Sequence, residues 1–62
     1  MTKPEAVTEA IRRIDAGDPA TQFVIRRGDK YDVEPGTQPT RTGWKVAEMI
    51  KATNVHAYRP KF

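Results

Sequence analysis

Cysteine is absent from this 62-residue sequence, and histidine occurs once, at His56. Without cysteine, disulfide scaffolds, Cys-ligated zinc sites and thiol catalysis are excluded. One histidine cannot form a His-pair metal site. Small secreted domains usually stabilise a thin core with disulfides, so the lack of cysteine favours a reducing compartment. We therefore expect a cytoplasmic protein that carries no metal ion and no cofactor.

The sequence also lacks long apolar runs and the glycine motifs of common enzymes. No stretch approaches the ~18–20 apolar residues that a membrane span needs, and the first residues lead into a charged amphipathic segment rather than an apolar signal core. The P-loop, the G-x-G-x-x-G fingerprint and the G-x-S-x-G elbow are all missing. A chain this short has little room for an enclosed active site. We expect neither membrane association nor enzymatic activity.

What is present is a short, charged and slightly basic chain. Hydrophobic residues make up 37% of it, below the ~45–50% typical of globular domains, and a chain of this length buries only ~60% of its unfolded surface. The 11 Lys and Arg residues exceed the 8 Asp and Glu residues, giving a net charge of +3, which mildly favours acidic partners. These values predict one small domain spanning residues 1–62, for which forming a homodimer would be one way to gain stability.

Residues 3–16 carry the signals of an amphipathic helix. Thr2 and Glu5 have the spacing of a capping box, and Pro4 falls in the first turn, where its missing N–H costs nothing. Gly17 suits the left-handed position that ends a helix. Apolar residues recur at helical spacing, at Val7, Ala10, Ile11 and Ile14.

Residues 22–27 and 31–34 are typical of two antiparallel strands joined by a tight turn. A two-residue turn would pair Ile25 with Asp32 and set an acid against the apolar face. A three-residue turn would pair Ile25 with Val33 instead. Because a one-residue slip reverses every side chain, we expect burial to select the three-residue turn.

The C-terminal half predicts a loop, a second helix and a third strand. Breaker residues fill positions 35–42, and residues 55–59 have strand character. Between them, residues 43–53 favour a helix, because four apolar residues would share one side of it, namely Val46, Ala47, Met49 and Ile50. The predicted fold is an α+β domain of α-β-β-α-β order, with a three-stranded, mostly antiparallel sheet and both helices on one face.

Our first functional hypothesis is docking on a larger protein partner, as an accessory, regulatory or inhibitory module of a size common among proteins of phages and mobile elements. Trp, Tyr and Arg dominate protein hot spots because they bury large areas and keep a polar handle. Trp44 would be an exposed anchor, or else it would close a small satellite core against Pro35 or Pro39. The residues predicted to contact the partner are Arg26, Arg27, Trp44, Lys45, Tyr58 and Arg59.

The alternative hypothesis is binding to single-stranded nucleic acid or RNA through the C-terminal third. From residue 41 onward the chain has five cations and one carboxylate, Glu48, with aromatic residues between them. Phosphates attract cations, and unstacked bases attract aromatic faces. The predicted contacts are Arg41, Lys45, Lys51, His56, Arg59 and Lys61. No RNP, KH or helix-turn-helix signature accompanies them.

Overall fold

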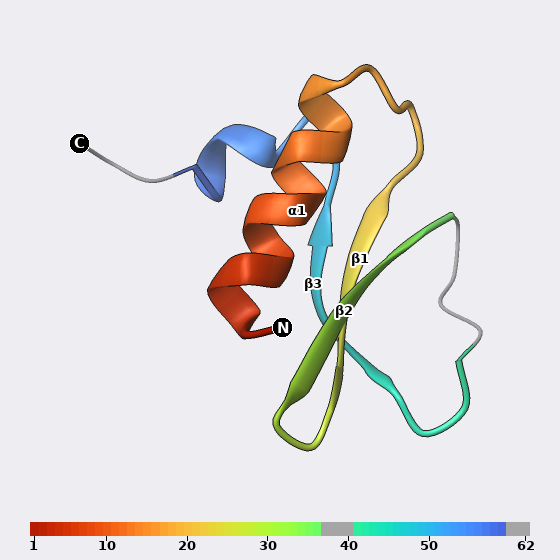
Figure 1. Ribbon diagram of the computed structural model, residues 1–62. Helices are drawn as coiled ribbons and strands as arrows, with labels where there is room; N and C mark the ends of the chain where they lie inside the picture. Colours follow the sequence, from red (N-terminus) through yellow and green to blue (C-terminus); the bar gives the residue numbers. More distant parts are fainter. Residues whose placement is uncertain (37–40, 60–62) are drawn as a thin grey trace.

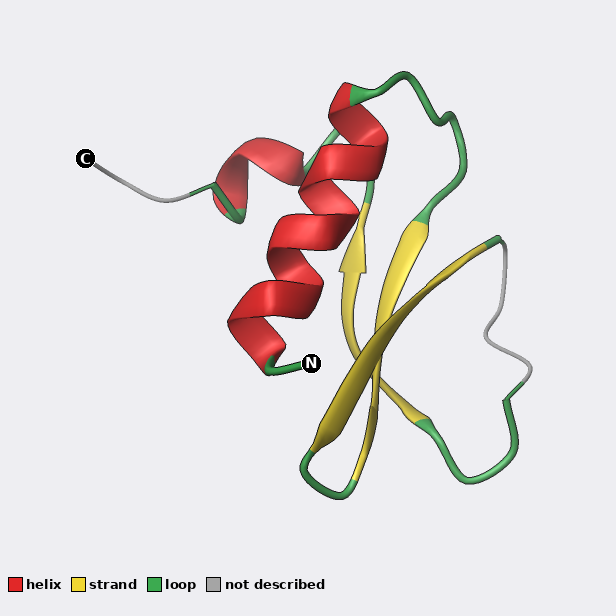
Figure 2. Cartoon of the chain, viewed as in Figure 1, coloured by secondary structure: helices red, strands yellow, loops and turns green. Residues whose placement is uncertain are grey.

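The computed structural model describes residues 1–36 and 41–59 as one α-helix packed on a three-stranded sheet (Figure 1). The elements are α1 (Lys3–Asp15), β1 (Gln22–Arg27), β2 (Lys30–Pro35), β3 (Lys45–Ile50) and a short 3-10 helix, η1 (Val55–Ala57). The strand order is β2-β1-β3, with both pairings antiparallel. Helix α1 covers one face of the sheet (Figure 2). The α+β class is confirmed, whereas the second helix and the α-β-β-α-β order are wrong.

The first helix forms where the sequence predicts it, because both of its ends are fixed by local hydrogen bonds. The Thr2 hydroxyl accepts from the Glu5 N–H at 3.3 Å, and the Glu5 carboxylate accepts from the Thr2 N–H at 2.8 Å, completing the capping box. At the other end the Gly17 N–H donates to the Ile14 carbonyl at 3.0 Å, with Gly17 at a φ of +97°. That left-handed conformation suits glycine at the end of a helix.

The core lies between α1 and the sheet. Two small residues, Ala6 and Ala10, are fully buried on the helix, which lets its backbone approach the strands closely. Larger apolar residues of the predicted stripe surround them and are half-buried. The buried cluster consists of Ala6, Ala10, Val24, Val33, Ile50 and Val55.

The β1–β2 hairpin has the two-residue turn, so the predicted three-residue turn is wrong. Gly28 and Asp29 form this turn, with Gly28 at a φ of +62°, as a type II′ hairpin turn requires at its first position. Ile25 consequently pairs with Asp32. Since residues directly opposite one another share a face, the acid does lie beside the apolar side chain.

Arg41 compensates for the acids that this register places on the face of the sheet opposite α1, here called the far face. Its guanidinium lies 2.7 Å from an oxygen of Asp32 and 3.2 Å from one of Glu34. The far face is not open to water at its centre, because Phe23 is 5% exposed and Ile25 is fully buried. Arg41, which lies outside the hairpin, thus allows the two-residue turn to place Asp32 and Glu34 beside the buried side chains of Phe23 and Ile25.

Residues 43–53 do not form the predicted helix, because most of them belong to β3. This strand pairs with β1 and carries one extra residue, Ala47, at a bulge. Val46 and Met49 lie on the far face and are 47% and 43% exposed, whereas Ile50 is buried against α1. Pairing at this edge completes a three-stranded sheet, and an isolated two-stranded hairpin would be marginal.

The predicted strand at 55–59 is also wrong, because the chain turns after β3. The Asn54 side chain closes that turn, accepting from the Lys51 N–H at 2.7 Å and donating to the Met49 carbonyl at 3.1 Å. η1 follows and adds Val55 to the core. Of the predicted loop at 35–42, the first residue ends β2, and residues 37–40 lie outside the described residues.

Candidate binding site at the hairpin end

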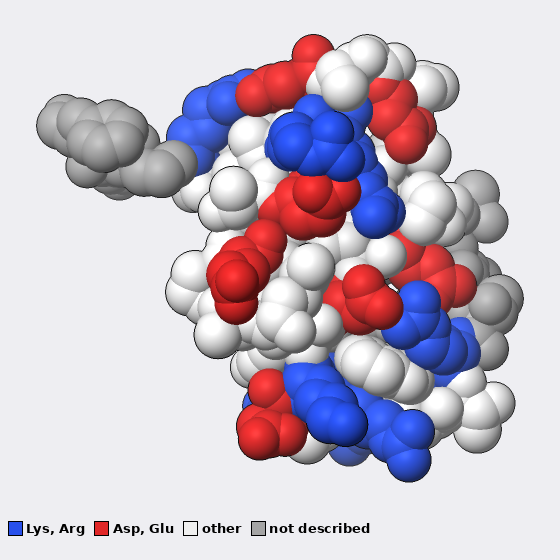
Figure 3. Space-filling view, viewed as in Figure 1, with Lys and Arg blue, Asp and Glu red and all other residues white. Residues whose placement is uncertain are grey.

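Four cations gather where the β1–β2 hairpin turns and β3 begins. Arg26 lies directly opposite Lys45 in the β1–β3 pairing, and Arg27 lies directly opposite Lys30 in the β1–β2 pairing. All four side chains are exposed. Figure 3 shows Lys and Arg side chains clustered at this end of the molecule, the lower end in that view. We call Arg26, Arg27, Lys30 and Lys45 the basic end.

The basic end holds most of the positive charge that the described part of the chain leaves without an ion pair. Of the ten described Lys and Arg residues, five form ion pairs with carboxylates, namely Lys3, Arg12, Arg13, Arg41 and Arg59. The four residues of the basic end form none, and neither does Lys51, which follows β3 at the opposite end of the sheet. Like charges directly opposite each other destabilise a sheet.

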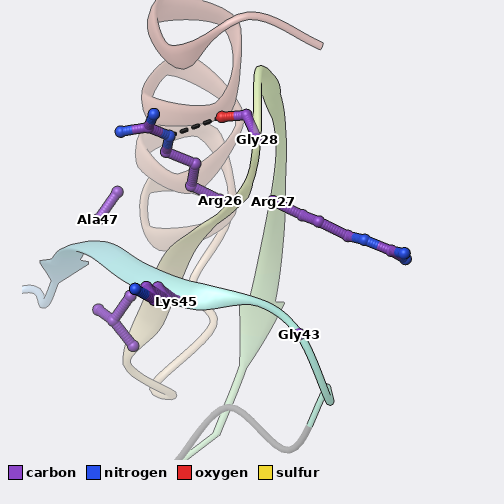
Figure 4. A pocket seen from close by; sticks show the side chains of 7 residues that line it. Arg26, Arg27, Gly28, Gly43, Lys45 and Ala47 are labelled. Carbon is purple, nitrogen blue, oxygen red and sulfur yellow. Dashed lines mark hydrogen bonds between the residues drawn. The ribbon is translucent and has the colours of Figure 1, made fainter.

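A cavity of about 400 Å³ opens among these cations. Arg26 and Arg27 extend in opposite directions from β1, and the Arg26 Nε donates to the Gly28 carbonyl at 2.6 Å (Figure 4). Gly28 and Gly43 leave backbone uncovered at the rim of the cavity. The lining residues are Arg26, Arg27, Gly28, Gly43, Lys45, Val46 and Ala47. Since no carboxylate belongs to this lining, the cavity suits an anion.

Trp44 lies beside the basic end and is held by Arg41. The indole is half-buried, and the Arg41 guanidinium carbon lies over the ring, 5.0 Å from its centroid, within the range of a cation–π contact. The hydrogen bond from Arg41 holds the pKa of Asp32 below its ordinary value. The indole is therefore neither sealed in the core nor fully exposed. Pro39, one of its two predicted contacts, lies outside the described residues.

The structure brings together four of the six residues predicted to contact a protein partner. Arg26, Arg27 and Lys45 belong to the basic end, and Trp44 adjoins it. Tyr58 and Arg59 lie elsewhere and are already engaged. The Tyr58 hydroxyl donates to Glu48 at 3.0 Å, which raises the pKa of Tyr58. The Arg59 guanidinium binds both carboxylate oxygens of Asp15, at 2.9 and 2.5 Å.

The residues predicted to contact nucleic acid are scattered. Lys45 belongs to the basic end and Arg41 adjoins it, but Arg41 and Arg59 are paired with carboxylates. Lys51 and His56 follow β3, at the opposite end of the sheet from the hairpin turn. Lys61 lies outside the described residues. Lys30, the fourth residue of the basic end, was not among the predicted contacts. The two-residue turn places it opposite Arg27, whereas the sequence pattern favoured the three-residue turn instead.

Several kinds of site are not found in residues 1–36 and 41–59. No group of three or more His, Asp or Glu side chains is placed to hold a metal ion, and no helix there is long and apolar enough to cross a membrane. His56 and the turn residue Asp29 lie at opposite ends of the sheet. Comparison with protein-family models, curated proteins and solved structures finds no match to the chain.

Proposed function

We propose that this chain is a non-enzymatic nucleic-acid-binding protein whose basic end contacts the phosphate backbone. The observation that carries the proposal is the cross-strand register, which sets Arg26 opposite Lys45 and Arg27 opposite Lys30, with no described carboxylate bridging either pair. Such pairs lower the stability of a small sheet. The two pairs lie on opposite faces of the sheet, and a phosphate chain that crosses this end would contact cations of both, because Lys and Arg supply many of the contacts to phosphate oxygens.

The composition of the basic end favours nucleic acid over a protein surface. The centre of a protein–protein interface is depleted of charged residues, and lysine is depleted across the interface. The basic end consists of four charged residues, and two of them are lysines. Gly28 and Gly43 also leave room for a ligand's backbone to come close to the chain.

Fluorescence anisotropy with a labelled single-stranded oligonucleotide tests the proposal. Each neutralised phosphate changes log K by about −0.7 per unit of log[salt] for single strands. Four contacts therefore predict a slope of roughly −3. A slope near zero, or no binding at low salt, would contradict the proposal.

Matched variants assign the contacts to the basic end. Arg27→Gln and Lys45→Gln each remove one phosphate contact, and each should weaken binding and reduce the slope by about 0.7. Lys51→Gln removes the same charge from an unpaired, exposed lysine at the opposite end of the sheet. It should leave the slope unchanged. Equal losses in all three variants would indicate a response to net charge alone.

Docking on a larger protein, with a regulatory or inhibitory effect, is the second candidate, favoured by a different observation. Val46 and Met49 are 47% and 43% exposed on the far face of β3, where a partner could bury them. In this case, capture of the partner would survive nuclease and high salt, and it would be lost in Val46→Glu and Met49→Glu. A second copy of the chain is one such partner, which sedimentation analysis detects.

A further inference from the structure

A second cavity, of about 410 Å³, lies between the hairpin turn and Trp44. Its volume falls within the ~300–1,000 Å³ of small-ligand sites. The lining combines an aromatic ring, a glycine, two cations and a carboxylate, from Arg27, Gly28, Asp29, Lys30 and Trp44. These are the elements that single-stranded nucleic acids meet in their binding sites: an aromatic platform for the base and cations for the phosphates on either side.

The aromatic element of this cavity is held in place before any ligand arrives. Asp32 and Glu34 fix the Arg41 guanidinium, and Arg41 lies over the indole of Trp44 at 5.0 Å. A fixed ring loses little conformational entropy when a base stacks on it, which favours binding. Arg41 therefore holds in place a ring that lines this cavity.

The acidic element is a hydrogen-bond acceptor without a partner. The carboxylate of Asp29 forms no hydrogen bond or ion pair with any described residue, although Arg27 and Lys30 line the same cavity. An ionised carboxylate only accepts, and its two oxygens match two adjacent donors. Among the common bases, guanine presents two N–H donors side by side, N1–H and the N2 amine, on its Watson–Crick edge.

We propose that this cavity takes one unstacked guanine base, which stacks on Trp44 and donates two hydrogen bonds to Asp29. Arg27 and Lys30 would then contact the flanking phosphates. The inference rests on the proposed nucleic-acid binding and adds a preference for single strands, because the Watson–Crick edge of a paired guanine is not accessible.

Three short oligothymidylates of equal length test the proposal: one with a central guanosine, one with inosine there and one with thymidine throughout. Inosine lacks the N2 amine. The guanosine oligonucleotide should bind about tenfold more tightly than the other two, the discrimination that one bidentate base contact gives. Trp44 is the one tryptophan of the sequence, so stacking should also quench the protein's tryptophan fluorescence.

Two variants separate the base contact from the backbone contact. Asp29→Asn should abolish the preference for guanosine over inosine and keep salt-dependent binding to oligothymidylate. Trp44→Phe retains a smaller ring for Arg41 and should weaken binding to single strands more than binding to duplex. Circular dichroism checks that both variants fold.

The outcomes distinguish this inference from the proposed function. Equal affinity for guanosine and inosine in the unmodified protein, or duplex binding as tight as single-strand binding, would overturn the base site and leave the basic end standing. Absence of salt-dependent binding to every oligonucleotide would overturn both.

Discussion

Arg26 of β1 lies directly opposite Lys45 of β3, and no carboxylate of the described chain pairs with either side chain. Other arginines of the domain are paired with carboxylates; Arg59, for example, binds both carboxylate oxygens of Asp15. The uncompensated pair is therefore a local departure from the electrostatics of the rest of the fold. Such departures from local stability rules are expected where a ligand binds.

Replacing Lys45 by Glu should raise stability and weaken oligonucleotide binding together. The variant replaces a like charge opposite Arg26 with an opposite charge, a gain of roughly 0.2–1 kcal/mol. For a chain of this size that corresponds to an increase in Tm of several degrees, at about 4–8 °C per kcal/mol. Thermal unfolding followed by circular dichroism measures the gain.

Lys51→Glu is the matched control for this prediction, because Lys51 is exposed and unpaired at the other end of the sheet. It should change Tm little and keep binding. If both variants were stabilised equally, general relief of net charge would explain the result, and the pairing of Arg26 with Lys45 would carry no special cost.

The first helix was predictable because its signals are local. The capping box of Thr2 and Glu5 and the terminating Gly17 each act within a few residues, so no distant contact is needed to interpret them. The predicted stripe included Ala10 but missed Ala6, the other residue at the centre of the buried face. The structure buries Ala6 and Ala10 there, because a closely packed helix needs small residues at its nearest approach.

β3 was not predictable from its own pattern, because a bulge imitates helical spacing. The extra residue, Ala47, places Val46 and Met49 on the same face of the sheet although they are three positions apart. Residues three and four apart also share a face of a helix. Whether this segment forms a helix or a strand is decided by its pairing with β1, which lies outside the segment. Sequence reasoning therefore named Lys45 as a contact but could not place it opposite Arg26.

Truncations at adjacent positions test this strand. Ile50→Ala removes a fully buried side chain and should cost about 2–5 kcal/mol, most of the reserve of a domain this small. Met49→Ala should cost much less, because Met49 is 43% exposed on the opposite face. The predicted helix would have buried both. Comparable losses in the two variants, measured by urea unfolding, would contradict the strand.

The charge cluster on α1 should make stability depend on acid pH. Hydrogen bonds from Arg12 and then from Arg13, at 2.7–2.8 Å, lower the pKa of Glu9 to about 2. Because this pKa is lowered on folding, the stabilisation is complete above the ordinary value of 4.5 and is lost as the pH falls towards 2. Unfolding of Glu9→Gln should therefore respond less to acid over this range than unfolding of the unmodified protein.

Side-chain NMR titration checks the same cluster directly. Arg12→Gln should raise the pKa of Glu9 part of the way towards 4.5, since Arg12 is the larger of the two influences. Lys3→Gln, which removes a cation paired with Glu48 instead, should not. A Glu9 carboxyl that titrates at its ordinary value in the unmodified protein would show that the cluster does not persist in solution.

Arg41→Gln should loosen the far face and the indole together. The substitution removes the cation between Asp32 and Glu34 and the guanidinium that lies over Trp44. The pKa of Asp32, which the hydrogen bond from Arg41 lowers, should rise towards its ordinary value. The stabilisation that this carboxylate gives above its unfolded pKa would shrink accordingly. Trp44 emission should shift as the ring loses its partner.

Because Arg41 lies outside the basic end, the salt slope of Arg41→Gln for oligothymidylate should persist while the preference for guanosine weakens. An unchanged Asp32 titration would show that Arg41 does not hold these acids, and the explanation of the two-residue turn would then fail.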